Sequence, residues 1–399
     1  MGRLKQSDNQ KPEKPWRICA IFAPQTLTDS TTTVDSTLHL LEPLAEEVFA
    51  ITGNFPGDVT GSDKIHFIDI KTKENPRSPM LVRISRFIMQ QLKISCRLIK
   101  IASGIDIVFL AAGTAALFLP ALTAKLLRKK VILLRHGTDS FQERIKSDYR
   151  DTLLGLGRGI FPAMVHTSIR INCSLADRIA VFSPNITDPR LKGYAKKISV
   201  SGSRFYLDID TFKVEKSLDS RDNLVGYIGR FEEIKGVMNF VKAIPLILRE
   251  SPGIKILLGG DGPMREEIEK HIEDAGLGDR VVLAGWIPHD RLPQQLNEIR
   301  LLVIPSYAEA GPHIVFEAMA CGTPVLAAPV GVMPDVIKDG ETGFILEDNS
   351  PECIAQNTIR ALNHPNLNQI IRAARELIER DHTHEAAVER YRSILASLK

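Results

Sequence analysis

Short apolar runs rich in isoleucine and valine alternate with segments of helical period along most of the chain. A strand that is apolar throughout is covered on both faces, which is typical of parallel sheets rather than antiparallel ones. Parallel strands need long crossover connections, and helices usually provide them. This alternation constrains the fold more than any other feature of the sequence, and it predicts an α/β fold built of βαβ units.

The pattern runs through the chain twice. The polar stretch from Val214 to Asn223 indicates a linker between two similar doubly wound domains, and 399 residues suffice for two or three domains at about 150 residues each. Such domains would face each other across a cleft, with ligands at the carboxyl ends of the strands.

We expect strands over 17–22, 48–52, 65–70, 105–110, 131–135, 178–183 and 197–201, and then over 224–229, 254–259, 281–284, 301–305, 324–328 and 343–346. Helices are expected over 79–102, 114–129, 236–249, 263–275, 291–298, 312–321 and 333–337, and along the tail from 366 to 399.

Composition excludes several classes of protein. Apolar residues make up 44% and charged residues 25% of the chain, so disordered, collagen-like and coiled-coil chains are excluded. The 51 basic and 48 acidic residues leave a charge of +3, too balanced for a dedicated nucleic-acid binder. The polar start of the chain predicts no secretory signal, and Pro120 argues that the apolar run 107–124 belongs to a core. An odd number of scattered cysteines fits neither a disulfide framework nor a zinc site, and favours a reducing cytosol: Cys19, Cys96, Cys173, Cys321 and Cys353.

The first motif follows the first strand of the second half. Gly229 ends that strand, so a ligand can approach the backbone there, and Arg230 and Lys235 place two cations on the next loop. A planar guanidinium and a point-charge ammonium suit a phosphate or diphosphate. The alternative is an ordinary loop whose arginine and lysine are solvated beside Glu232 and Glu233.

A second glycine-rich turn, 259–263, follows the next strand, with Pro263 expected to open a helix. Its spacing differs from the G-x-G-x-x-G of dinucleotide-binding folds, and residues 23–27 after the first strand of the chain contain no glycine at all. The sequence therefore argues against a nicotinamide or flavin dehydrogenase.

The segment from Ser306 to Val325 carries the most information. Gly311 and Pro312 are expected to start a helix whose first backbone N–H groups form an anion site. Glu317 lies further along among apolar neighbours, where a carboxylate is costly unless it is satisfied. It could cap backbone amides or pair with an internal base. Alternatively, Glu317 accepts hydrogen bonds from the two adjacent hydroxyls of a ribose, and Glu309 accepts from the hydroxyls of a second polyol. A ligand with a phosphate between two sugars is a nucleotide sugar.

With these motifs in order, the chain resembles a retaining glycosyltransferase of the GT-B fold, family 4, the "glycosyl transferases group 1" type. The resemblance covers about residues 17–397 and is most specific over 224–346. Glu309 and Glu317, with seven residues between them and followed by A-M-A-x-G-x-P-V, match the family signature. The loops 229–236, 260–263 and 340–344 match its phosphate-binding loop, its second turn and its closing turn.

The resemblance implies a GT-B architecture of two doubly wound Rossmann-like domains. Residues 16–213 would bind the acceptor, residues 222–380 would bind the nucleotide sugar, and a helix in 381–399 would cross back to the first domain. It also implies transfer of a hexose-type sugar from a nucleotide diphosphate-sugar to an acceptor hydroxyl with retention, with no metal or other cofactor. A nucleotide-sugar epimerase or hydrolase of the same fold and a non-catalytic GT-B binding subunit are the alternatives.

The resemblance also assigns roles to residues. Arg230 and Lys235 would bind the diphosphate, Glu317 the ribose, and Glu309 the transferred sugar. His136, at a strand end of the first half, lies where relatives contact the donor sugar or the acceptor, and it completes the catalytic set. Donor-binding positions are Gly229, Gly262, Trp286, Ile287, Gly311, Pro312, His313, Ile314, Val315 and Glu317, with Trp286 and Ile287 at the nucleobase.

Two departures from the family pattern concern loops. The five residues 309–313 replace the longer loop of many relatives, and the glycine pair expected after the first strand is missing, so the hydroxyls of 30–33 are candidate substitutes.

The expected helix 79–102 is basic and amphipathic. Arg86, Lys93, Arg97 and Lys100 recur at helical spacing roughly opposite Leu81, Ile84, Ile88, Leu92 and Ile99. Such a helix can lie on an anionic membrane surface, or it can present a solvated face of a packed helix. The expected partners are thus a nucleotide-sugar donor, a glycan or lipid-linked acceptor and an anionic membrane surface, without nucleic acid. We expect the protein to be cytoplasmic, at most peripheral to the inner membrane face.

Overall fold

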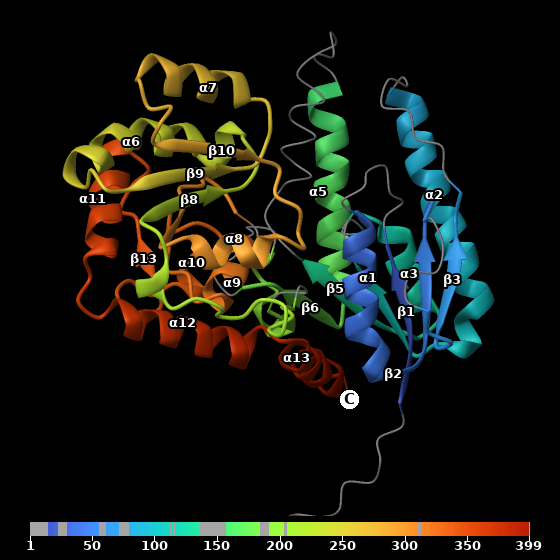
Figure 1. Cartoon of the computed structure of the whole chain (residues 1–399). Coiled ribbons are helices and arrows are strands. Elements are labelled where there is room, and N and C mark those ends of the chain that lie inside the picture. Colours follow the sequence, from blue (N-terminus) through green and yellow to red (C-terminus); the bar gives the residue numbers. More distant parts are fainter. Residues whose placement is uncertain are drawn as a thin grey trace, which may run out of the picture.

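The computed structural model describes residues 15–22, 30–55, 61–71, 80–111, 114, 116–135, 157–183, 191–202, 206–309 and 313–398. Within them the chain forms two separate sheets, each made entirely of parallel strand pairs and each flanked by helices (Figure 1). One sheet belongs to the first half of the sequence and the other to the second half, which confirms the doubly wound α/β architecture.

The first sheet has seven strands in the order β3-β2-β1-β4-β5-β6-β7. Its order reverses beside β1, because β2 lies on one side of β1 and β4 on the other. Each expected strand of this half is present, with ends that differ by at most three residues. The strands are β1 Trp16–Ile21, β2 Ala45–Thr52, β3 Ile65–Asp69, β4 Ile107–Leu110, β5 Lys130–Arg135, β6 Arg178–Val181 and β7 Ile198–Val200.

Helices cover both faces of this sheet because alternate strand residues point to opposite faces. Cys19 and Ile21 of β1 face the cluster formed with α2 (Met80–Ile101), α3 (Phe118–Leu126) and α5 (Gly157–Leu175). Ile18 and Ala20 face the cluster formed with α1 (Ser30–Leu41) and α13 (His384–Ala396). Serine and threonine in α1, and glycine and proline in α5, weaken the helical pattern, so the sequence had not delimited these two helices.

The second sheet has the order β10-β9-β8-β11-β12-β13, with its reversal between β8 and β11. Its strands also match the expected ones: β8 Leu224–Ile228, β9 Lys255–Gly259, β10 Val281–Gly285, β11 Leu301–Ile304, β12 Val325–Ala327 and β13 Phe344–Ile345. The helices are α6 Val237–Glu250, α7 Arg265–Asp274, α8 Leu292–Glu298, α9 His313–Ala320, α10 Met333–Val336, α11 Pro351–Leu362 and α12 Leu367–Asp381.

Two helix starts differ from expectation. Pro263 does not open α7, which begins at Arg265, because the Met264 amide donates to the carbonyl of Phe231 in the loop after β8. Helix α3 begins at Phe118 rather than at Thr114, because Thr114 forms a turn in which both its amide and its hydroxyl donate to the carbonyl of Ala111.

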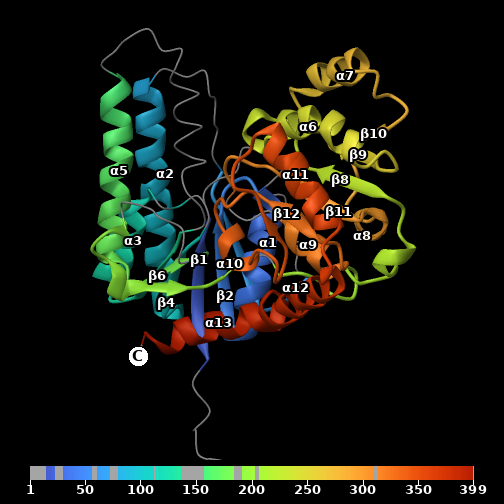
Figure 2. The ribbon, with the colours of Figure 1, turned by 90° about the vertical axis from the view of Figure 1, so that its left-hand side faces the viewer.

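The last helix returns to the first half of the molecule, as the resemblance implied. Helix α12 runs along the second half and α13 continues beneath the first sheet (Figure 2). Tyr391 of α13 is 1% exposed, its ring centroid 6.3 Å from that of Phe109 in β4. Arg390 also donates to the carbonyl of Ser201. The domain boundaries at 213, 222 and 380 stay predictions.

The halves also meet where β6 ends. Phe182 packs in the same buried cluster as Phe212, α9 and α10, and the Ser183 hydroxyl donates to the carboxylate of Asp335 in α10. The carboxyl end of a strand in the first sheet therefore contacts the second half directly.

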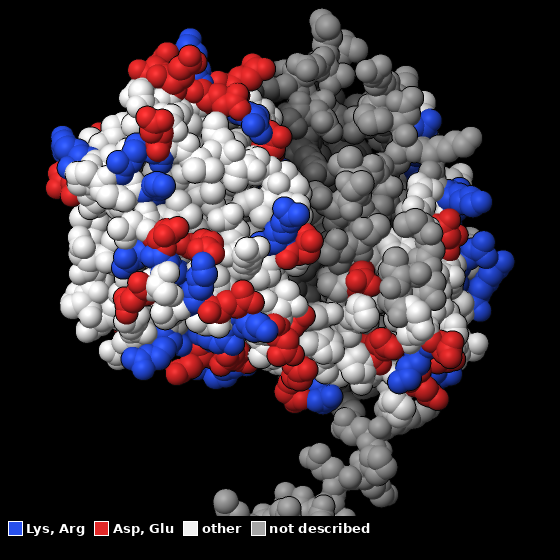
Figure 3. Space-filling model, in the orientation of Figure 1, with Lys and Arg blue, Asp and Glu red and all other residues white. Residues whose placement is uncertain are grey.

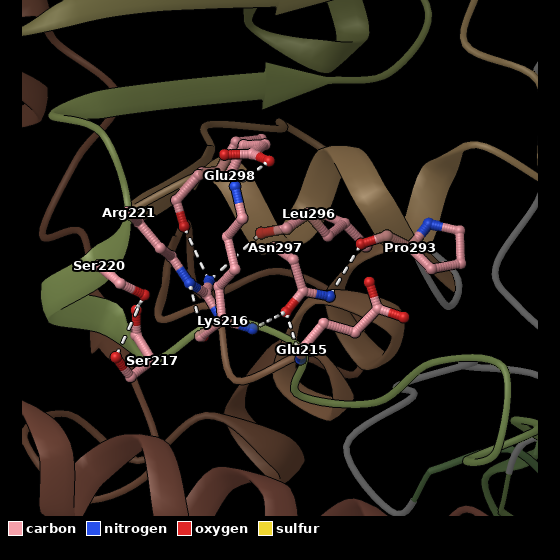
Figure 4. Close-up of polar contacts among 10 residues, drawn as sticks. Glu215, Lys216, Ser217, Ser220, Arg221, Pro293, Leu296, Asn297 and Glu298 are labelled. Atoms are coloured by element: carbon pink, nitrogen blue, oxygen red, sulfur yellow. Dashed lines mark hydrogen bonds and ion pairs between the residues drawn. The ribbon is translucent and has the colours of Figure 1, made fainter.

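The stretch 214–223 is not a loose linker, contrary to its polar composition. Asn297 of α8 accepts hydrogen bonds from the amides of Glu215 and Lys216 (Figure 4). It also donates to the carbonyl of Lys213. Arg221, only 5% exposed, donates to the carbonyls of Lys216, Leu296, Ile299 and Cys321 and to the hydroxyl of Thr323. Arg221 thus anchors the segment through carbonyls that are distant in the sequence, although most of its other residues are exposed as their polarity suggests.

Arg221→Leu should destabilise the second half by about 3 kcal/mol, because several buried carbonyls lose their donor together. Burial lowers the pKa of Arg221 to about 10, so the group is still charged at neutral pH. Urea denaturation followed by circular dichroism measures the effect. Arg249→Leu is the matched control, because that side chain is 73% exposed and its loss should change stability by less than about 0.5 kcal/mol. Equal effects of the two substitutions would contradict the anchoring role.

Candidate functional site

The candidate site lies at the reversal of strand order in the second sheet. β8 and β11 are neighbours there, and their connections leave in opposite directions, which opens a crevice at their carboxyl ends. The loop 229–236 follows β8 and the segment 305–309 follows β11. The two segments that the sequence singled out are thus brought to the same place by the topology.

An ion pair joins these two segments. Lys235 Nζ lies 2.8 Å from Glu309 Oε1, and the Ser306 hydroxyl donates to the same oxygen at 2.7 Å. Both side chains are largely shielded, with 19% of the lysine and 8% of the glutamate side chain exposed. An ammonium and a carboxylate therefore face each other across the reversal point.

Two glycines allow the loops to approach this closely. Gly236 has φ +66°, and a Cβ on it would lie 1.9 Å from the carbonyl oxygen of Pro305. Gly331, in the loop after β12, has φ +59°, and a Cβ there would lie 1.7 Å from the carbonyl oxygen of Glu309. A side chain at either position would push a loop away from Glu309, so the pair with Lys235 depends on both glycines.

The second acidic residue is satisfied by a histidine. Glu317 of α9 is 5% exposed, and its Oε1 lies 3.0 Å from Nε2 of His289, which is in the loop after β10. Pairing with a base was one alternative for Glu317 in the sequence, but nothing there identified His289 as the base. The only signal was a histidine three residues after Trp286, at another strand end of the same sheet.

The carboxylate changes the acidity of this histidine. By accepting a hydrogen bond from the ring, the carboxylate of Glu317 raises the pKa of His289 above its usual value, against a smaller opposing effect of desolvation, although 73% of the histidine side chain is exposed. The ring also packs edge-to-face against Phe212, with centroids 5.4 Å apart. His289 thus links α9 to the segment that joins the two sheets.

Arg230 behaves differently from Lys235. Its guanidinium lies 2.6 Å from Glu232 of the same loop, and 61% of its side chain is exposed. The Tyr227 hydroxyl donates to the Arg230 carbonyl and holds the backbone of the loop. This arrangement is the solvated pair that the sequence left as the alternative, and only one nitrogen of the guanidinium contacts Glu232.

The predicted nucleobase positions differ in exposure. Trp286 is 72% exposed, so its ring does not pack at the edge of the core and its faces are accessible. Ile287 is half-buried, and its Cδ1 fills the space beside Gly259. Beneath them, the Gly229 amide donates to the Gly259 carbonyl, and the Gly262 amide donates to the carboxylate of Asp261.

The helix start predicted at Gly311 and Pro312 is observed at His313, the first residue of α9, and those two residues lie outside the described part of the chain. His313 is exposed, Ile314 is half-buried and Val315 is 1% exposed, so the backbone amide is the group that Val315 can offer a ligand. His136 and the side chains of 30–33 also lie outside the described residues. Among the side chains that are described, no three His, Cys, Asp or Glu converge in a group that could hold a metal ion.

Comparison with protein families gives one match. Residues 208–377 match the family described as "Glycosyl transferases group 1". The match includes Lys235, His289, Glu309 and Glu317, and it leaves the first sheet outside.

Curated relatives match over part of their length. The chain is 32% identical to alpha-D-kanosaminyltransferase of Streptomyces kanamyceticus, over 38% of this chain and 39% of the relative. It is 39% identical to 2-deoxystreptamine N-acetyl-D-glucosaminyltransferase of Streptomyces fradiae, over 29% of this chain and 28% of the relative. The matched segments therefore span well under half of these two relatives.

Solved structures match over almost the whole chain. HepE of Anabaena, solved in complex with UDP and glucose, superposes with a TM-score of 0.68 at 15% identity and covers 96% of this chain and 100% of its own. At this identity the likeness shows the fold alone, and it confirms the GT-B class.

Removing the histidine partner of Glu317 should change stability in a pH-dependent way. The pKa of His289 is higher in the folded chain than in the unfolded one, so the ion pair stabilises fully below the unfolded value, about 6.5. The stabilisation is lost as the pH rises through the folded value. The Tm difference between wild type and His289→Ala should therefore be larger at pH 6 than at pH 9, as measured by differential scanning fluorimetry.

The control is the same His289→Ala substitution made in a Glu317→Gln variant, because a neutral amide does not stabilise the charged form of the imidazole. There the effect of His289→Ala on Tm should no longer depend on pH. The same pH dependence in both backgrounds would mean that another group is responsible.

Proposed function

We propose that this chain is a glycosyltransferase that moves a hexose-type sugar from a nucleotide diphosphate-sugar to an acceptor hydroxyl, with retention and without a metal ion. One observation carries the proposal. Two shielded carboxylates with seven residues between them, Glu309 and Glu317, lie at the reversal point of the second sheet, each held by a base from another strand end. The family match over 208–377 and the glycosyltransferase names of the matched relatives support it.

The cations and the start of α9 would bind the diphosphate. Lys235 has three N–H donors and uses one on Glu309, so the others can serve phosphate oxygens. The first backbone amides of α9 have no partners within the helix, and their dipoles favour an anion. Arg230 would exchange its exposed pair with Glu232 for a phosphate, at little cost because exposed pairs contribute little.

The two carboxylates would bind the neutral ends of the donor. Glu317 uses Oε1 for His289, and its other oxygen can accept from a ribose hydroxyl. The positive charge of protonated His289 offsets the repulsion between Glu317 and the nearby diphosphate. Glu309 is offset by Lys235 in the same way while it meets hydroxyls of the transferred sugar. Trp286 offers an accessible ring face to the base.

In the proposed reaction the acceptor oxygen forms a bond to the anomeric carbon, and the bond from that carbon to the phosphate oxygen breaks. The acceptor approaches on the face of the leaving group, so the configuration is retained, and its proton passes to the departing phosphate oxygen. Lys235 and the α9 amides stabilise the negative charge that develops there, which is commonly the largest contribution to catalysis. His136 would contact the sugar or the acceptor from the first half.

The acceptor is proposed to be a glycan or a lipid-linked molecule, bound by the first half of the chain. HepE, whose structure contains UDP and glucose, supports a nucleotide-sugar donor for this fold. All five cysteines are free thiols, which supports the cytoplasm as the proposed location.

Lys235→Ala should lower kcat/KM by about 10²–10³-fold, because one donor to the developing phosphate charge is lost. UDP-, GDP- and ADP-sugars are first screened by thermal shift, since a bound donor raises Tm. Transfer is then measured with the sugar that binds. Lys242→Ala, an exposed lysine on the neighbouring α6, is the matched control and should keep full activity.

Equal activity of Lys235→Ala and wild type would refute the assignment. Release of free sugar without an acceptor would indicate a hydrolase, and nucleotide binding without turnover on any acceptor would indicate a binding subunit.

Metal independence has its own test. Since the phosphate charge is proposed to be neutralised by Lys235, Arg230 and backbone amides, exhaustive chelation with EDTA should leave the rate of transfer unchanged. A rate that falls with EDTA and returns with Mg²⁺ or Mn²⁺ would show that a metal ion takes part.

A further inference from the structure

Helix α2 exposes large apolar side chains instead of burying them. Ile88 is 44%, Met89 54%, Leu92 45% and Ile99 56% exposed. The residues that α2 turns toward the sheet are Gln91, Ile94, Ser95 and Leu98, all buried. The apolar stripe seen in the sequence is therefore largely separate from the face that packs on the core.

The exposed face of α2 has two parts. At 3.6 residues per turn, Ile88, Leu92 and Ile99 fall within about 40° of one another around the helix. Arg86, Lys93, Arg97 and Lys100, all exposed, fall within about 60° of one another further round. Met89 lies between these two groups. We call these eight residues the α2 face.

The helices of this layer contain basic residues and no acidic ones. The sequences of α2, α3 and α5 contain arginine and lysine but no aspartate or glutamate. The three helices pack side by side on one face of the first sheet, and Leu122 and Leu126 of α3 are exposed as well. Over the second half, by contrast, acidic and basic side chains are interspersed (Figure 3).

We propose that the α2 face is a docking surface for an anionic phospholipid bilayer. The four cations would contact lipid phosphates, and the apolar stripe would enter the headgroup boundary, as in helices that lie in the plane of an interface. Within the described residues no helix is long and apolar enough to cross a bilayer, so the contact is peripheral.

The chemistry of the face favours this occupant over two others. A second copy of the chain would bring four cations against four cations, which opposes pairing through this face. A nucleic acid would neutralise the cations but leave Ile88, Leu92 and Ile99 in water. An anionic bilayer satisfies both parts of the face at once.

The test is co-sedimentation of the full chain with vesicles. The protein should bind vesicles of phosphatidylcholine mixed with phosphatidylglycerol, and bind phosphatidylcholine alone much more weakly. Replacing Arg86, Lys93, Arg97 and Lys100 together with glutamine should weaken binding roughly tenfold or more. The matched control replaces four exposed cations of the second half with glutamine, Lys242, Arg249, Lys255 and Lys270, and it should bind like wild type.

The apolar part is tested separately. Leu92→Ser with Ile99→Ser should also weaken vesicle binding, whereas Val282→Ser, at a 51% exposed valine of β10, should not. Equal loss in both charge variants would mean non-specific attraction and would overturn the proposal, as would unchanged binding in the serine variant. A wild-type dimer that the serine variant abolishes, without vesicle binding, would assign the face to a second copy. Vesicle binding does not depend on the donor, so either proposal can fail while the other holds.

Discussion

The structure of the second half depends on one constraint, that a carboxylate shielded from water must be paired. Glu309 and Glu317 lie on consecutive segments of the chain, yet their bases come from loops after two other strands. The two pairs connect the loop after β8 to the segment after β11, and the loop after β10 to α9. Lys235 offsets the charge of Glu309, and His289 offsets that of Glu317 when its ring is protonated, which would allow both acids to lie beside the proposed diphosphate.

Much of this arrangement follows from local sequence. Apolar strand runs and the glycines that end them are local signals, so the strands and the residues at their carboxyl ends were predictable, and so was the meeting of 229–236 with 305–309. The Glu-x7-Glu spacing likewise identified both acids before any contact was known. These features need no knowledge of which distant residues touch.

Other features depend on distant contacts and were not predictable. His289 is distinguished only by its partner, which is 28 residues away. The polar composition of 214–223 did not predict its anchoring by Asn297 and Arg221. The sequence also treated Arg230 and Lys235 alike, although the first is exposed and the second is shielded. Whether Leu92 and Ile99 are covered likewise depends on where α3 lies. For His289, for Lys235 and for the contacts of Arg221, the deciding neighbour is remote in the sequence.

The return of α13 to the first sheet has a mechanical consequence. The polypeptide passes from one half to the other at two places, near 202–213 and again at 382–383. Two covalent crossings define a line, and rotation about that line is the relative motion that stretches neither of them. Sliding of one half past the other would stretch one crossing or the other, so a hinge rotation about this line is the movement that the covalent connections resist least.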